Sequence, residues 1–177
     1  MKSHVANRTK PSKWYRTPSF GVSVLLAVAI VGVLIVLVTH EHGMTGVKAA
    51  YAVLTHTTLR LLGQPTTVTG SVVQSGRFGI TVVTACTGLF VTTLFVVAVL
   101  LFPASWVAKS IGAAVGVIGI AVVNVVRLVS LYFVGVYWPQ FFDLAHQLVW
   151  QSLLIVIAVS LWLVWAGRTT GRKRVAP

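Results

Sequence analysis

Acids and cysteines are scarce in this chain. Glu41 and Asp143 are its only carboxylate side chains, against 14 lysines and arginines, so a buried cation would find few partners. The single cysteine, Cys86, excludes an intramolecular disulfide and any metal site built from several cysteines. The histidines outside the last apolar segment show no metal-ligand spacing with acids or cysteine. We therefore expect no metal and no other cofactor.

Apolar residues are abundant instead, at 56% of the chain, which indicates an integral membrane protein. A net charge of +12 would suggest nucleic-acid binding in a soluble protein. Here the basic residues gather in two tails, 1–19 and 167–177, where membrane proteins carry them to fix topology. No basic face or RNA-binding motif accompanies the charge, so we expect the lipid bilayer, and no nucleic acid, as a partner.

Four long apolar segments predict an all-α polytopic membrane protein with about four transmembrane helices. The first, 20–39, is long enough to cross a bilayer, which needs about 20 residues. A cleaved signal peptide would have an apolar core of about 7–15 residues. We therefore expect a retained anchor, although Ala49-Ala50-Tyr51-Ala52 resembles a weak cleavage site. The other three segments, 87–102, 109–138 and 144–166, predict a three-helix membrane core over residues 86–166.

The region between the first two spans, residues 40–85, is more polar. Charges recur every few residues over 47–63, which predicts an amphipathic helix lying on the membrane surface. Residues 65–84 predict a β-hairpin, with β-forming residues on both sides of a turn at 74–76. Because open strands are not tolerated in lipid, the hairpin should sit in water against the membrane face.

The distribution of lysines and arginines predicts that both termini are cytoplasmic. With four spans, ten lie inside, including Lys109 in a short loop, and three lie outside. Cys86 then falls at the outer end of the second span and His146 at the outer end of the fourth. Arg127 lies 18 residues beyond Lys109, or about 27 Å along a helix, and so nearer the outer edge. Three chemically capable side chains thus approach one extracytoplasmic face of the cell membrane.

Arg127 stands inside an apolar segment, where an arginine at the centre of a membrane helix costs about 2.5–3.5 kcal/mol. It could snorkel to the outer interface. However, Asn124 precedes it by three residues on the same helix face, and Ser130 continues that side. A polar strip on one helix face normally turns to the protein interior, so we favour a functional role for Arg127.

A lone cysteine in an apolar segment is usually an inert small hydrophobe. Cys86 instead stands where a predicted strand meets a helix, and it is followed by Thr87 and by Gly88, which allows close approach. At a helix N-terminus its thiolate would be stabilised by the helix dipole and by a nearby arginine. These features make Cys86 a candidate nucleophile.

His146 alone could cap a helix or sit among lipid headgroups. Asp143 comes three residues earlier and could accept a hydrogen bond from the imidazole, the geometry that orients a catalytic base. Asp143 could equally be the N-cap of the last helix, and we slightly prefer that interpretation.

The motifs Ala85-Cys86-Thr87-Gly88-Leu89 and Asn124-x-x-Arg127, followed by His146, resemble the exosortase/archaeosortase family over about residues 64–166. Members are multi-pass membrane proteins thought to act as cysteine transpeptidases. Their substrates are exported proteins with a C-terminal motif, a transmembrane helix and a basic tail. The resemblance implies Cys86 as nucleophile, Arg127 as its electrostatic partner and His146 as acid/base. Relatives often have Ser where Thr87 stands, and many have more helices, so this chain resembles a compact member.

We therefore expect a membrane cysteine transpeptidase or peptidase that attacks a peptide bond just outside the membrane. The spacing of Gly112, Gly116 and Gly119 predicts close helix packing, and the substrate's helix could dock on that face. Two other classes remain open. A small transporter subunit would need Arg127 but not Cys86, although four spans without an internal repeat argue against alternating access. A non-catalytic binding or assembly factor would depend on the hairpin instead.

Overall fold

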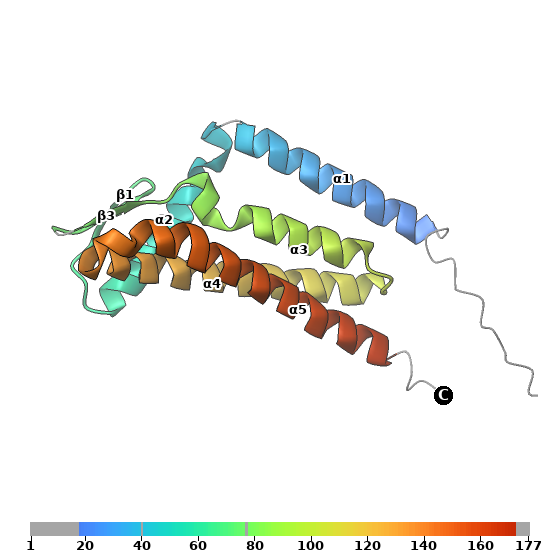
Figure 1. The fold of residues 1–177 in the computed structure, drawn as a ribbon. Helices are drawn as coiled ribbons and strands as arrows, with labels where there is room; N and C mark the ends of the chain where they lie inside the picture. Colours follow the sequence, from blue (N-terminus) through green and yellow to red (C-terminus); the bar gives the residue numbers. More distant parts are fainter. Residues whose placement is uncertain (1–17, 40, 77, 173–177) are drawn as a thin grey trace, which may run out of the picture.

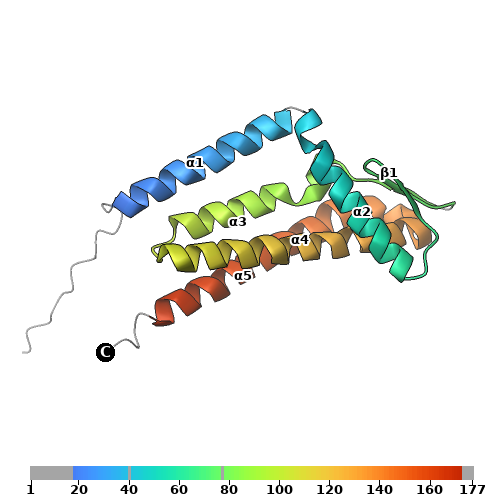
Figure 2. The ribbon, with the colours of Figure 1, turned by 180° about the vertical axis from the view of Figure 1, so that it is seen from behind.

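The structure, a computed structural model, describes residues 18–39, 41–76 and 78–172. It is a helix bundle with a smaller layer across one end, as Figures 1 and 2 show from opposite sides. The bundle contains α1 (Pro18–Thr39), α3 (Leu89–Leu101), α4 (Trp106–Tyr137) and α5 (Trp150–Arg172). The end layer contains α2 (Thr45–Leu61), β1 (Thr67–Thr69), β2 (Val72–Gln74) and β3 (Gly79–Thr81). The predicted class of an all-α polytopic membrane protein is confirmed.

Most of the N-terminal basic tail lies outside the described residues, as do Arg77 and the last residues, 173–177. Within the described ranges, three helical stretches are long and apolar enough to cross a membrane. These stretches are Pro18–Val36, Trp106–Tyr137 and Pro139–Thr170. Many large apolar side chains on α1, α4 and α5 are exposed, as contact with lipid requires.

The predicted second span is shorter than expected. Helix α3 has 13 residues and is about 20 Å long, against a hydrocarbon core of about 30 Å. It begins only after Gly88, whose φ of +68° interrupts the helix, and it ends at Leu101, because the next residue, Phe102, is extended before Pro103. It packs alongside α1, α4 and α5 in the bundle (Figure 1).

The third and fourth spans begin earlier than predicted. Helix α4 starts after Ser105, whose hydroxyl accepts a hydrogen bond from the Ala108 N–H, so Lys109 lies inside the helix rather than in a loop. The last helical stretch opens with a 3-10 turn, η4 (Pro139–Phe141), and a π-helical stretch, η5 (Leu144–Val149), before α5. Residues assigned to the C-terminal tail, up to Arg172, continue α5.

The end layer holds a three-stranded antiparallel sheet in the order β1-β2-β3, where a single hairpin was predicted. The predicted turn between 74 and 76 joins β2 to β3. The two-residue turn at Gly70 and Ser71, between β1 and β2, was not predicted from the sequence. Gly70 has a φ of +58°, which hairpin turns of this length need at the first central position.

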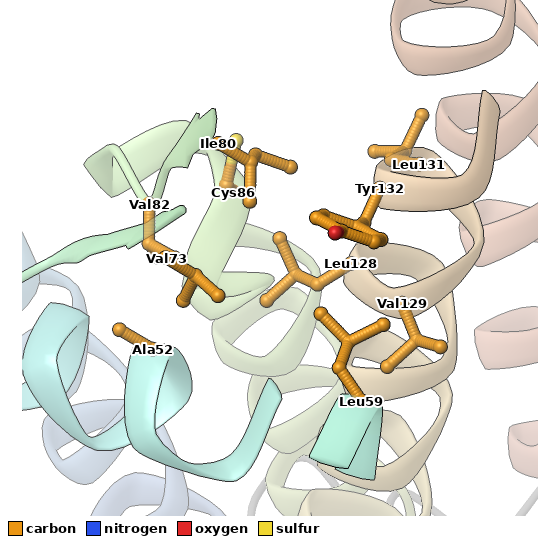
Figure 3. Close-up of a cluster of buried hydrophobic side chains, with 10 residues drawn as sticks. All are labelled: Ala52, Leu59, Val73, Ile80, Val82, Cys86, Leu128, Val129, Leu131 and Tyr132. Carbon is orange, nitrogen blue, oxygen red and sulfur yellow. The ribbon is translucent and has the colours of Figure 1, made fainter. Parts of the chain in front are cut away.

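The end layer packs on the second half of α4. In Figure 2, α2 crosses this end of the bundle. Residues from α2, the sheet and α4 form one buried cluster that also contains Cys86 (Figure 3). The cluster consists of Ala52, Leu59, Val73, Ile80, Val82, Cys86, Leu128, Val129, Leu131 and Tyr132. This packing fixes the strand that leads to Cys86.

A second buried cluster joins α3, α4 and α5 in the other half of the bundle. The glycines of α4 allow this contact, since a Cβ at Gly112 would overlap Trp165 and one at Gly116 would overlap Phe95. Close helix packing at the glycines is confirmed. Trp165 and Phe95 lie against Gly112 and Gly116, and all four residues line a cavity of about 760 Å³.

Candidate active site

Cys86 lies in η3 (Thr84–Thr87), a 3-10 turn between β3 and α3. Its N–H donates to the Val83 carbonyl at 2.8 Å, and the Thr87 hydroxyl donates to the Thr84 carbonyl at 2.7 Å. Gly88 then adopts the left-handed conformation that only glycine takes without strain. Cys86 is therefore one turn short of α3, and the expectation that it sits at that helix's N-terminus is wrong.

Asn124, on α4, is hydrogen-bonded to the backbone of the turn η3 that contains Cys86. Its Nδ2 donates to the Cys86 carbonyl oxygen at 2.7 Å, and the side chain is completely buried. A Cβ at Gly88 would lie 3.2 Å from the Asn124 Cγ, so the glycine permits this close approach. Asn124 and Gly88, both predicted as supporting residues, thus act together on the backbone of Cys86.

His146 meets Cys86 across 60 residues of sequence, with the Cys86 Sγ 3.2 Å from the His146 Nε2. The histidine lies in the π-helical stretch η5, a distortion often found at functional sites. The Phe142 ring stacks on the imidazole with a centroid distance of 5.9 Å. A thiol at this distance can pass its proton to the imidazole and become a thiolate nucleophile.

Asp143 takes neither of its two predicted roles in the described part of the chain. It makes no side-chain cap hydrogen bond, because its own backbone is already helical and the helical stretch starts earlier, at Pro139. No hydrogen bond joins it to His146 among the described contacts. It lies beside that residue in the wall of a cavity that Cys86 and His146 also line.

Arg127 is 2% exposed and belongs to the same region of α4 as Asn124. Its Nε and Nη1 are buried and have no hydrogen-bond partner among the described residues. Ser130, predicted to extend the polar strip, donates instead to the Arg127 backbone carbonyl at 2.8 Å. Arg127 therefore carries buried, unpartnered hydrogen-bond donors about one helical turn from Asn124, the residue that holds the Cys86 backbone.

The cavity beside the pair has a volume of about 380 Å³. One wall is formed by β3 and the residues on either side of it, and the other by the connection between α4 and α5. Within the described ranges, no three His, Cys, Asp or Glu side chains come together as metal ligands would. The arrangement places a thiol and an imidazole in contact beside a cavity, with a buried cation on the same helix as Asn124.

A family model described as transmembrane exosortase matches residues 12–165 of the chain, which include all of the candidate site residues. The chain belongs to the transmembrane exosortase family. Neither a curated protein nor a solved structure matches it. The resemblance inferred from the motifs around Cys86, Asn124 and His146 is thereby confirmed, and this exosortase-family chain is a multi-pass membrane protein.

Two residues near the candidate active site of this exosortase-family chain were not identified from the sequence. Phe142 precedes His146 by four residues, and that helical spacing could have identified it as the ring that packs on the imidazole. Tyr132 is 1% exposed, and its hydroxyl donates to the Ser75 Oγ at 2.8 Å, which ties α4 to the loop before β3. No sequence signal links these two positions, because they are 57 residues apart.

Proposed function

We propose that the chain is a membrane cysteine transpeptidase or peptidase that removes C-terminal sorting signals from exported proteins. The observation that carries the proposal is the 3.2 Å distance between the Cys86 Sγ and the His146 Nε2 beside a cavity. Membership of the transmembrane exosortase family supports it. The substrates would carry a short motif, a transmembrane helix and a basic tail.

In the proposed first half-reaction, the His146 Nε2 takes the thiol proton and the Cys86 thiolate attacks a peptide carbonyl carbon. The tetrahedral intermediate collapses as the C–N bond breaks, and His146 returns the proton to the leaving amine. The products are a thioester on Cys86 and the released membrane helix with its basic tail. In the second half-reaction, water or an amine attacks the thioester, His146 accepts its proton, and that proton returns to the cysteine sulfur.

Arg127 would stabilise negative charge during these steps. Its unpartnered Nε and Nη1 could bind the thiolate before attack or the oxyanion afterwards. Either role fits a buried, charged donor, because charge-assisted hydrogen bonds are stronger than neutral ones. Thr87, Gly88 and Asn124 would position the cysteine through its backbone, without contact to the substrate.

The position of Cys86 suits a substrate anchored in the same bilayer. The cysteine lies where the end layer meets the bundle, so it can reach a bond just above a neighbouring membrane helix. With cytoplasmic termini, as the lysine and arginine distribution favours, this level is the extracytoplasmic face. A substrate held there would be cut on the outside and keep its basic tail inside.

Mass spectrometry of C-terminal peptides from envelope proteins tests the proposal. Cells carrying the wild-type chain are compared with cells carrying Cys86→Ala, and Thr69→Ala on the exposed face of β1 serves as a matched control. We expect proteins ending in a helix and basic tail to keep that tail only with Cys86→Ala. If processing continues with a stably inserted Cys86→Ala protein, Cys86 is not the nucleophile. The hypotheses of a transporter subunit and of a binding factor then gain support.

A further inference from the structure

Strand β3 lies at the edge of the sheet, and one of its long sides has no partner in the described ranges. The backbones of Phe78 and Val82 bond toward the β2 side, through contacts of 2.9 and 2.8 Å. In an antiparallel ladder the direction of the backbone groups alternates from residue to residue. The N–H and C=O groups of Gly79 and Thr81 therefore point away from β2, toward the open side.

This open side borders the cavity at the candidate active site. Gly79, Thr81 and the following Val83 all line the cavity, opposite the connection between α4 and α5. At the Phe78 end of the strand, the Phe78 and Phe142 rings lie 5.7 Å apart and join the two walls. At the other end the walls meet again through Cys86 and His146. The unpaired backbone N–H and C=O groups of β3 therefore form a row along the cavity, and Cys86 lies at the end of that row.

We propose that an extended segment of a polypeptide substrate occupies this cavity and pairs with β3 as a fourth strand. The proposal rests on the proposed function of Cys86 as a nucleophile. Pairing through the main chain gives affinity that depends little on side-chain sequence, and it fixes the position of each carbonyl along the strand. A carbonyl held in this way at the end of the strand would face the Cys86 sulfur, which is the orientation that catalysis requires.

The cavity favours an extended peptide over other occupants. Among the described residues of its lining, Asp143 is the single acid and no lysine or arginine is present, so these residues offer no basic counter-charge to an anion such as a lipid phosphate. A helical segment could not use the edge, because its backbone groups are bonded within the helix. An extended chain offers alternating donors and acceptors that match those of Gly79 and Thr81.

The direction of the bound segment follows from the chain order. Strand β3 runs toward η3 and Cys86, and α3 comes next. In the proposed substrate, the membrane helix follows the bond that is cut. The segment before that bond would therefore run toward Cys86, parallel to β3, and leave its membrane helix beside the bundle.

The test removes one backbone N–H on the open side of β3 and leaves the hydrogen bonds between the strands of the sheet in place. Thr81→Pro does this, since proline is tolerated on an edge strand where its nitrogen faces away from the neighbour. Val68→Pro is the control, because Thr69 pairs with Val72 across a two-residue turn and the Val68 backbone therefore points outward from the opposite edge. Val68 also packs on the buried cluster, so this control weakens the sheet at least as much.

Two readouts use the full-length protein in membranes. The first is the processing rate of a protein whose tail is retained in the Cys86→Ala comparison, and the second is the alkylation rate of Cys86 by iodoacetamide. We expect Thr81→Pro to lower processing about tenfold or more, the factor that one lost hydrogen bond of about 1.4 kcal/mol represents. Alkylation should be unchanged, because the small reagent needs no strand pairing, and Val68→Pro should keep both rates.

Normal processing by Thr81→Pro would overturn the strand-pairing proposal while leaving the Cys86 proposal intact. Continued processing by Cys86→Ala would instead overturn the proposed function itself. If Thr81→Pro lowers alkylation as well, crosslinking decides the question. With p-benzoylphenylalanine at position 81 in a Cys86→Ala background, we expect a crosslink to the retained substrate, and none with the same group at Thr69. Equal crosslinks at both positions, or none at 81, would overturn the proposal.

Discussion

Two buried cations lie on the same helix, α4, and they are held in opposite ways. The Lys109 Nζ donates to the Ser23 Oγ at 2.8 Å and to the Leu100 carbonyl at 2.5 Å, and it lies 5.0 Å from the Trp106 ring centroid. The Arg127 guanidinium is equally buried, but its Nε and Nη1 have no partner among the described residues. One cation ties three helices together, and the other keeps its donors unused.

This difference separates a structural cation from a functional one better than burial does. Both side chains are less than 10% exposed, and neither forms an ion pair with Asp143, the one acid whose side chain the structure describes. Leaving a buried donor unsatisfied costs about 1–3 kcal/mol, and more for a charged group. The rest of the structure tolerates that cost at Arg127, which is expected where a substrate or intermediate completes the site.

The largest effect should come from Arg127→Met, which removes the charge and roughly keeps the volume. If Arg127 stabilises the thiolate or the oxyanion, processing of the identified substrate should fall about 100–1,000-fold, as when an oxyanion donor is lost. The thermal unfolding midpoint in detergent should stay the same or rise, since unpaired buried donors are removed. A large loss of stability with unchanged processing per folded molecule would make Arg127 a second structural cation.

A smaller effect on the same reaction is expected from Asn124→Ala, which leaves the Cys86 carbonyl without the donor that holds it. A buried bond of this kind is worth about 1–3 kcal/mol when one partner is left unsatisfied. We expect a roughly tenfold fall in processing and a matching fall in the alkylation rate of Cys86, because the thiol moves with its backbone. Unchanged alkylation would show that Asn124 does not position the cysteine.

Much of this contrast could not be read from the sequence. The spacing of Asn124 and Arg127 correctly predicted an inward polar face, since a helix period needs only local geometry. The positive-inside argument placed Cys86 and His146 on one face, and the structure brings them into contact. Whether Arg127 finds a partner depends on side chains from other elements, which no spacing reveals. The same is true of Lys109, whose partners come from α1 and α3.

Other errors had local causes. Ser105 is a favourable N-cap residue and lies four positions before Lys109, so the sequence itself contains a signal that Lys109 lies inside α4. Gly70 likewise marked the missed turn. The interruption at Gly88 is different, because a glycine before an apolar run is compatible with a continuous helix. Its left-handed conformation goes together with the close approach of Asn124 from α4, a tertiary interaction.

Lys109→Met should change stability and leave the chemistry alone. It leaves the Leu100 carbonyl without its side-chain donor and removes the contact between α1 and α4 through Ser23. We expect a loss of about 1–3 kcal/mol in the free energy of unfolding, measured by denaturation in detergent. Processing per folded molecule should equal that of the wild type. A selective loss of processing would show that Lys109 acts at the site and would remove the distinction from Arg127.

The smallest effects concern the serines next to each cation, and they sharpen the contrast most directly. The Ser23 hydroxyl donates to the Ser19 carbonyl and also accepts from the Lys109 ammonium, whereas the described bond of the Ser130 hydroxyl goes to the backbone carbonyl of Arg127. Ser23→Ala should lower stability by about 0.5–1.5 kcal/mol. In a double-mutant cycle, Ser23→Ala should lower stability much less when Lys109 has already been changed to Met.

Ser130→Ala and Arg127→Met should be additive, because the serine does not touch the guanidinium. Denaturation of the four single and two double variants in detergent, beside the wild type, measures both coupling energies. Coupling at Ser130 as large as at Ser23 would mean that Arg127 shares its surroundings with the helix in the way Lys109 does. Coupling confined to Ser23 is the result expected if the bundle uses one cation for its own cohesion and leaves the other free for a ligand.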